Sequence, residues 1–172
     1  MDFAELIKKR SSVRKFNREK TITDSQIKQL LEMAILTPSE GNLQPWYFVV
    51  VRDGKVKSKL YEAALKQQPV KEAPVVIVTC LNKEKTFWKY GLRGTQLYAI
   101  QSTALATYQL WLAAVNEGLA GCWIGAFDEE QVSQILGLSK NLRPVVLLCL
   151  GYAGESPELT KRESIDKVTE YK

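Results

Sequence analysis

The sequence predicts a single domain, spanning residues 1–172, in which helices cover a buried sheet. At 172 residues the chain is long enough to bury one sizeable core. Three apolar runs of strand length, Tyr47–Arg52, Ala73–Leu81 and Arg143–Tyr152, alternate with segments of helical periodicity. Strands that alternate with helices predict a three-layer α/β or α+β fold, and the spacing alone does not separate the two.

Two helices are expected before the first strand. Asp2 and Glu5 have the spacing of a capping box, which predicts that the first helix begins there. The second is expected to begin at Thr23, because Gln26 follows three residues later. It should end at Pro38, since the residue before a proline is driven out of the α region.

The rest of the chain contains two longer helical segments and one short one. Lys55–Lys66 follows a turn, and Thr95–Glu117 has apolar and small residues on more than one side, which favours a subunit interface. The segment Gly118–Phe127 is interpreted as a glycine-rich turn. A short helix is then expected between Asp128, which caps it, and Gly137, which ends it.

The composition excludes several kinds of catalysis. The chain has no histidine, which rules out Ser-His-Asp and Cys-His mechanisms and histidine-ligated metals. Its three cysteines are far apart with no C-x-x-C pair, so neither a disulfide framework nor a zinc site is expected. An enzyme of this composition would depend on a cofactor for its chemistry, and we expect neither a catalytic side chain nor a metal ligand.

The charge and hydropathy patterns bear on partners and location. The formal net charge of +5 suits an anionic ligand and, less well, a nucleic acid. No apolar run approaches the roughly 20 residues that span a bilayer. The N-terminus lacks the order of a signal peptide, so we expect a cytoplasmic protein without a membrane partner.

The first candidate site is the segment RSSVR at Arg10–Arg14. Two guanidinium groups and two hydroxyls within five residues suit a phosphate, because arginine supplies forked, charge-assisted donors. The alternatives are a solvated basic helix end and a nucleic-acid patch, although no aromatic residues are interleaved with the charges.

Three further segments have residue types that bind planar or charged ligands. Ser39, Asn42 and Gln44 offer donors and acceptors to a heterocycle, or they form a turn. The glycines of Gly121–Phe127 let the backbone approach a ligand, or they simply connect two elements. The pair KR in the segment TKRES is either part of a site or a solvated charge run.

Taken in order along the chain, these segments resemble the nitroreductase family of FMN-dependent oxidoreductases. The pattern is R-S-S-V-R-x-F, then P-S-x-x-N-x-Q-P-W-x-F-x-V-V, then G-L-x-G-C-W-I-G, then K-R. It covers nearly the whole chain, and NLQPW is its most specific part. The resemblance implies an α+β, three-layer α-β-α fold with a mixed or antiparallel central sheet and a C-terminal tail exchanged with a partner subunit.

The resemblance also implies an FMN site. The residues that it assigns to the cofactor are Arg10, Ser11, Ser12, Arg14, Pro38, Ser39, Asn42, Gln67, Gln68, Ile124, Gly125, Ala126, Lys161 and Arg162. The Arg10–Arg14 segment matches residues that hold the phosphate and ribityl chain, with Ser11 contributing main chain. Lys161 or Arg162 matches a late basic residue that joins the phosphate site.

The remaining assignments concern the flavin ring. Pro38–Asn42 matches a segment that reaches the flavin from the partner subunit, which implies a homodimer with FMN at the interface. Ile124–Ala126 matches the loop whose backbone lies at the flavin N5. Either Gln67 or Gln68 falls near the pyrimidine edge, and the register leaves both open.

The sequence departs from longer relatives in two ways. The chain has little room for the helical insertion that shapes their substrate channel, and Gln101 stands where many of them have an acidic residue. The aromatic segment Phe87–Gly94 either lines the channel here or packs under a loop. Gln44 either contacts the ligand or holds the loop.

The activity implied by the resemblance is hydride transfer from NADH or NADPH, through the flavin N5, to a small electrophilic acceptor such as a nitroaromatic or a quinone, in a ping-pong cycle. The alternatives are another reduction on the same flavin, such as dehalogenation, a reaction that fragments the flavin, and a non-enzymatic FMN-binding redox sensor. A nucleic-acid-binding domain is the reading that the residues favour least.

Overall fold

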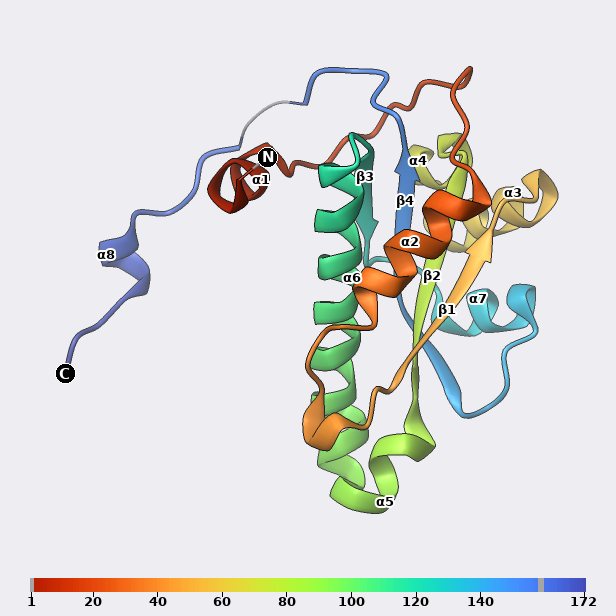
Figure 1. Ribbon diagram of the computed structural model, residues 1–172. Coiled ribbons are helices and arrows are strands. Elements are labelled where there is room, and N and C mark those ends of the chain that lie inside the picture. Colours follow the sequence, from red (N-terminus) through yellow and green to blue (C-terminus); the bar gives the residue numbers. More distant parts are fainter. Residues whose placement is uncertain (1, 158–159) are drawn as a thin grey trace.

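The computed structural model describes residues 2–157 and 160–172. Four strands in this part of the chain form one antiparallel sheet with the order β1-β2-β4-β3 (Figure 1). The strands are β1 (Trp46–Val51), β2 (Val75–Asn82), β3 (Ala120–Ile124) and β4 (Leu142–Gly151). The fold is therefore α+β, and of the two sheet types that the resemblance allowed, the antiparallel one is present.

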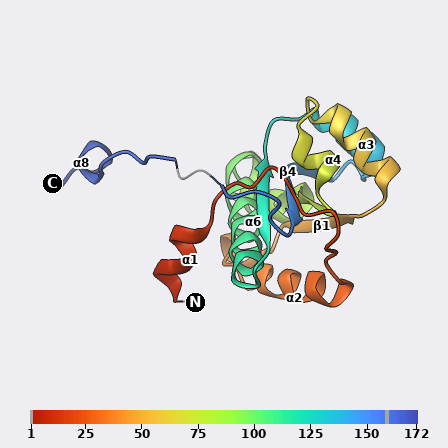
Figure 2. The ribbon, with the colours of Figure 1, turned by 90° about the horizontal axis from the view of Figure 1, so that it is seen from above.

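Helices cover both faces of this sheet. The helices of the described chain are α1 (Phe3–Lys9), α2 (Asp24–Ala34), α3 (Gly54–Ala63), α4 (Gln68–Glu72), α5 (Lys83–Arg93), α6 (Ala99–Asn116), α7 (Glu129–Leu136) and α8 (Ile165–Val168), with a 3₁₀ turn at Glu40–Asn42 and a π turn at Gly94–Tyr98; of these, α1 and α8 lie away from the sheet. Seen from above, α2 and α6 lie on one side of the sheet and α3 and α4 on the other (Figure 2).

The central strand β2 shows why its sequence is apolar throughout. Val75 and Ile77 pack with α2 and α6, whereas Val76 and Val78 pack with α3, α4 and α7. All four side chains are fully buried. Successive residues of a strand point to opposite faces, so a strand covered on both sides needs apolar residues at every position. This confirms the three-layer arrangement and the expectation of a strand buried on both faces.

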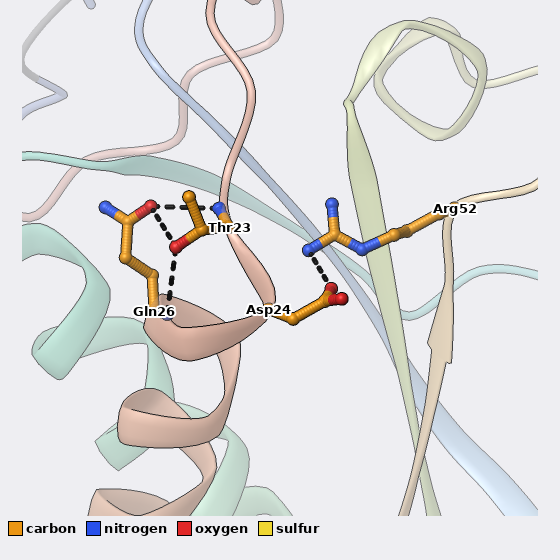
Figure 3. A network of polar contacts seen from close by, with 4 residues as sticks. All are labelled: Thr23, Asp24, Gln26 and Arg52. Carbon is orange, nitrogen blue, oxygen red and sulfur yellow. Dashed lines mark hydrogen bonds and ion pairs between the residues drawn. The ribbon is translucent and has the colours of Figure 1, made fainter.

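The N-terminal ends of the first two helices are capped as predicted. Asp2 and Glu5 form a capping box on α1, and Thr23 and Gln26 form one on α2. At α2, the Gln26 N–H donates to Thr23 Oγ1 at 3.2 Å, and the Thr23 N–H donates to Gln26 Oε1 at 2.9 Å (Figure 3). An ion pair of 2.9 Å between Asp24 and Arg52 joins the start of α2 to the end of β1.

Several predicted boundaries were wrong. Helix α2 ends at Ala34, four residues before Pro38. The segment Gly118–Phe127 is not simply a turn, because it contains the edge strand β3. Gly121, the second of the five residues of β3, weakens the strand pattern of this segment, although Cys122 and Ile124 are buried. Helices α4 and α5 were not predicted.

The C-terminal segment extends away from the rest of the domain (Figures 1 and 2). Its helix α8 leaves both Ile165 and Val168 67% exposed. These two apolar side chains of the tail therefore contact little of their own chain. Within the described residues, no helix combines the length and the hydropathy needed to cross a membrane.

Candidate functional site

The basic segment that follows α1 is extended and attached to the sheet. Ser12 forms a parallel bridge with Gly121 of β3, and the Val13 N–H donates to Gly121 O at 3.0 Å. Val13 points into the core, with 3% of its surface exposed. Side chains alternate along extended backbone, so Arg10, Ser12 and Arg14 lie on the face opposite Val13.

Arg10, Ser12 and Arg14 line a cavity of about 720 Å³. Its lining residues are Ile7, Lys8, Arg10, Ser11, Ser12, Arg14, Tyr108, Thr160 and Arg162. Three guanidiniums, one ammonium and several hydroxyls thus meet in one place, and none of the described residues that line it is acidic. Such a donor set fits an anion with several acceptor oxygens, such as a phosphate. We call this cavity the basic cavity.

The position of Arg10 is fixed by an aromatic pair on α6. Its guanidinium carbon lies 4.6 Å from the ring centroid of Trp111, a cation–π contact. Trp111 packs edge to face with Tyr108, with their ring centroids 6.5 Å apart. Of the two α6 aromatic residues, Trp111 therefore supports one of the arginines and Tyr108 lines the basic cavity.

A second cavity, of about 790 Å³, continues along α6. It is lined by Pro38, Ser39, Glu40, Tyr98, Gln101, Ser102, Ala104, Leu105, Tyr108 and Trp123. Tyr108 lines both cavities, so the two adjoin. We call this one the apolar cavity, because most of its walls are aromatic or aliphatic. Together the two cavities would accept an elongated ligand with an anionic end and a flat, largely apolar end.

The loop with the second sequence motif is held by its own polar groups. Ser39 Oγ accepts the Gln44 N–H at 2.9 Å, and Gln44 Nε2 donates to Asn42 Oδ1 at 3.3 Å. Gly41, Asn42 and Gln44 all have positive φ, between 50° and 58°, so the loop is tightly wound. Pro38 and Ser39 line the apolar cavity, whereas Asn42 lines neither cavity.

The same loop is attached to α6 by Glu40, which the sequence interpretation did not single out. Its Oε2 accepts a short hydrogen bond from Ser102 Oγ. Its Oε1 is buried and has no hydrogen-bond partner among the described residues. Glu40 has no recognisable sequence signal, because its partner lies 62 positions away along the chain.

The two candidate glutamines, Gln67 and Gln68, have different hydrogen-bond partners in the structure. Gln67 Nε2 donates to Ala126 O at 2.8 Å and to Ala64 O at 2.9 Å, so this amide supports the loop after β3. Gln68 Nε2 instead donates to Tyr61 Oη at 3.1 Å. The geometry therefore favours Gln67 as the residue associated with the loop at Ile124–Ala126.

The loop after β3 follows a residue that lines the apolar cavity. Ile124 is the last residue of β3 and is 3% exposed, whereas Gly125 and Ala126 are exposed. Trp123, one residue earlier, lines the apolar cavity. The segment Ile124–Ala126 therefore comes directly after a residue of the apolar cavity, and none of its three residues lines that cavity.

The two candidate basic residues near the C-terminus, Lys161 and Arg162, also have different surroundings. Arg162 lines the basic cavity, and its Nη1 donates to Thr160 O at 3.0 Å. Lys161 is exposed and does not line that cavity. Of the two alternatives left open by the sequence, Arg162 is therefore the one near Arg10 and Arg14.

The cysteines are buried, as predicted, and their burial disfavours the reactive thiolate form. Burial raises the pKa of Cys80 to about 12 and raises the pKa of Cys122 and Cys149 as well. All three thiols are free and buried in the described part of the chain. Within residues 2–157 and 160–172, no group of three potential ligands is arranged to hold a metal.

An antiparallel sheet covered on both faces, with a basic cavity and an adjoining apolar one, defines the class of this protein as three-layer α+β. The chain belongs to the nitroreductase family, whose model matches residues 7–78 and 66–152. This confirms the resemblance seen in the sequence.

Individual relatives show how wide that family is. An Archaeoglobus fulgidus protein provisionally named NADH dehydrogenase/NAD(P)H nitroreductase is 31% identical over 152 residues, which cover 86% of this chain and 83% of the relative. The 5,6-dimethylbenzimidazole synthase of Rhodospirillum rubrum is 30% identical over 178 residues, 88% of this chain and 83% of that one. The name of the first relative agrees with the expectation of an NAD(P)H-dependent oxidoreductase.

One solved structure bears on the cofactor. A provisionally named nitroreductase from Exiguobacterium sibiricum, crystallised in complex with FMN, superimposes with a TM-score of 0.90 at 25% identity. The match covers 100% of this chain and 98% of that one. The three-layer fold is therefore shared over nearly the full length of a protein that was crystallised with FMN.

Proposed function

We propose that this protein is an FMN-dependent oxidoreductase that uses NADH or NADPH to reduce a small electrophilic acceptor of the nitroaromatic or quinone type. The observation that supports this most directly is the basic cavity, in which Arg10, Arg14 and Arg162 converge beside the apolar cavity. Bound FMN would supply an N5 atom that accepts a hydride and passes it on, in a ping-pong cycle.

The residues of the basic cavity fit the phosphate end of FMN. A phosphomonoester has a charge of about −1.5 to −2 at neutral pH. The guanidiniums of Arg10, Arg14 and Arg162 offset that charge, and the hydroxyls of Ser11 and Ser12 add neutral donors.

The residues around the ring would act by position rather than by proton transfer. The exposed backbone at Gly125 and Ala126 is the proposed contact for N5, and Gln67 would hold that loop through Ala126 O. The wall of the apolar cavity at Tyr108 and Trp123 would exclude water from one face of the ring. No side chain is assigned as general acid or base.

We further propose that the active form is a homodimer. The apolar residues Met33, Ile35, Leu36, Leu105 and Ile165 are all between 48% and 69% exposed in the single chain. A second copy would cover this surface, receive the C-terminal tail and add its own Pro38, Ser39 and Asn42 to the ring site, next to the Pro38 and Ser39 that line the apolar cavity of the first copy. Sedimentation analysis tests this, and a monomer at micromolar concentration would contradict it.

A second candidate function keeps the flavin and changes the reaction. It is favoured by the R. rubrum relative, a 5,6-dimethylbenzimidazole synthase that is nearly as similar to this chain as the A. fulgidus protein. Dehalogenation is a further reaction of this class, and an FMN-binding redox sensor is the non-enzymatic alternative. Turnover of a nitroaromatic or a quinone with NAD(P)H, under air and under nitrogen, separates these possibilities.

The absorption spectrum of the purified protein tests the proposal as a whole. Bands in the blue and near-ultraviolet that bleach when NAD(P)H is added are expected. A colourless protein that does not take up added FMN would refute the assignment.

The phosphate site has its own test. The double variant Arg10→Ala, Arg14→Ala should lose FMN on gel filtration while its thermal unfolding stays cooperative. The matched control is Arg18→Ala, because Arg18 is exposed and pairs at 3.4 Å with Glu72 outside the basic cavity. Equal FMN retention in the double variant and the control would contradict the assignment.

A further inference from the structure

Glu155 joins the segment after the last strand to the basic segment near the N-terminus. Its Oε1 accepts the N–H of Arg14 at 2.9 Å and the N–H of Lys15 at 3.2 Å. The partners are 141 and 140 positions apart in sequence. A single carboxylate oxygen therefore binds two successive backbone N–H groups at Arg14, a residue that lines the basic cavity.

The surrounding backbone shows how Glu155 reaches that position. Phe16 forms an antiparallel bridge with Ala153, the Asn17 N–H donates to Tyr152 O at 2.9 Å, and the Gly154 N–H donates to Lys15 O at 2.9 Å. The two segments thus run side by side just before Glu155. This pairing ends at Gly154, so the carboxylate of Glu155 continues the contact towards Arg14.

Close packing also fixes this junction. A Cβ on Gly154 would lie 2.8 Å from the carbonyl carbon of Phe16, so the two backbones approach more closely than a side chain would allow. Glu155 therefore follows a rigid connection rather than a loose loop. The hydrogen bond from the Arg14 N–H is the main cause that lowers the pKa of Glu155, so its carboxylate is ionised at neutral pH.

We propose that Glu155 is a positioning residue for the phosphate end of the flavin. By binding the Arg14 and Lys15 N–H groups, it sets the backbone from which the Arg14 guanidinium projects towards Arg10 and Arg162. This inference rests on the proposed FMN function and adds to it a specific hydrogen-bond acceptor, the carboxylate of Glu155. Glu155 itself does not line the basic cavity, so it acts through Arg14.

The role of an acceptor can be distinguished from the role of a charge. In Glu155→Gln the amide oxygen still accepts both N–H groups, and the negative charge beside the arginines is lost. In Glu155→Ala the hydrogen-bond acceptor and the negative charge are both lost. If acceptor geometry is what matters, the Gln variant should bind FMN within about twofold of the wild type, and the Ala variant about tenfold more weakly.

The test compares FMN with riboflavin, which has the same ring and no phosphate. Dissociation constants are measured by quenching of flavin fluorescence on the full-length protein. Glu155→Ala should weaken FMN binding and leave riboflavin binding unchanged, because only the phosphate end depends on Arg14. Glu130→Ala, on the exposed first turn of α7, is the control for loss of a surface carboxylate.

Three results would overturn the proposal. They are unchanged FMN affinity in Glu155→Ala, equal weakening of FMN and riboflavin, and a Gln variant that is as weak as the Ala variant. If the Ala variant does not fold, Glu155→Asp takes its place. Its carboxylate is one methylene shorter. FMN binding should therefore be weaker than in the wild type by a factor between about two and about ten. Wild-type affinity in this variant would overturn the proposal.

The same data separate this inference from the proposed function. A wild-type protein that binds neither flavin refutes the FMN assignment and the role of Glu155 with it. A wild-type protein that binds FMN, together with an Ala variant that binds it equally well, refutes only the role of Glu155.

Discussion

Replacing Gly121 with alanine should destabilise the protein and weaken its anion site. Gly121 lies in β3, and a Cβ at this position would lie 2.6 Å from Trp111 Nε1 and 3.2 Å from Leu150 Cδ2. Trp111 is 4% exposed and Leu150 is fully buried, so neither side chain can move into solvent without losing core contacts. The added methyl group therefore has no space.

The magnitude follows from this overpacking. Extra methylene-sized groups in a well-packed core cost about 1–3 kcal/mol of the free energy of unfolding. In a domain of this size each kcal/mol lowers the melting temperature by about 2–4 °C. We therefore expect Gly121→Ala to melt roughly 2–12 °C below the wild type.

A shift of Trp111 should also reach the basic cavity, because the guanidinium of Arg10 lies 4.6 Å from its ring centroid. Cation–π contacts contribute about 0.5–1 kcal/mol at exposed sites. Loss of this contact would weaken FMN binding by about two- to fivefold.

The assay is thermal unfolding followed by circular dichroism, at one protein concentration and with and without FMN, since a bound ligand or partner raises the apparent stability. Gly54→Ala is the matched control. No described atom lies within 4 Å of its added Cβ, and Gly54 begins α3, where alanine is well tolerated. If Gly121→Ala melts within one degree of the wild type while the control is unchanged, Gly121 is not closely packed and the reasoning fails.

Three further predictions concern stability, pH and thiol chemistry. Thr23→Ala removes the cap of α2 and should lower the free energy of unfolding by about 1 kcal/mol in urea titration; an unchanged midpoint would count against the capping box. The hydrogen bond from Arg143 lowers the pKa of Glu129 from its ordinary value of 4.5. The ionised carboxylate of Glu129 therefore stabilises the fold fully above pH 4.5, and this stabilisation is lost as the pH falls through the lowered pKa of the folded state. Because both side chains are more than a third exposed, Glu129→Gln should cost less than about 1 kcal/mol at pH 7, with the difference from wild type shrinking below pH ~4.5; a pH-independent difference would contradict this. Cys80, with its pKa raised to about 12, and the other two thiols should not react with Ellman's reagent at pH 8 until the protein unfolds, and rapid labelling of the native protein would show that they are accessible.

The elements that could be predicted from the sequence are those with a strong local signal. The capping boxes at Asp2 and Thr23 and the buried strand β2 are where the pattern placed them. The strand β3 was interpreted as a turn, because Gly121 interrupts a short edge strand and the packing that requires this glycine involves residues far away in sequence. Local patterns do not record such contacts.

The candidate site was likewise predictable from the sequence only in part. By itself, the sequence determined the residue types: a basic segment at Arg10–Arg14, no histidine, and a set of motifs in the order of one family. Only the tertiary structure decided which members meet, bringing Arg162 rather than Lys161 into the basic cavity and Gln67 rather than Gln68 to Ala126 O. It also showed that Glu155 binds the Arg14 backbone across 141 residues. The physical reason is that a side chain's donors and acceptors are fixed by its chemistry, whereas their partners are fixed by where the folded backbone places them.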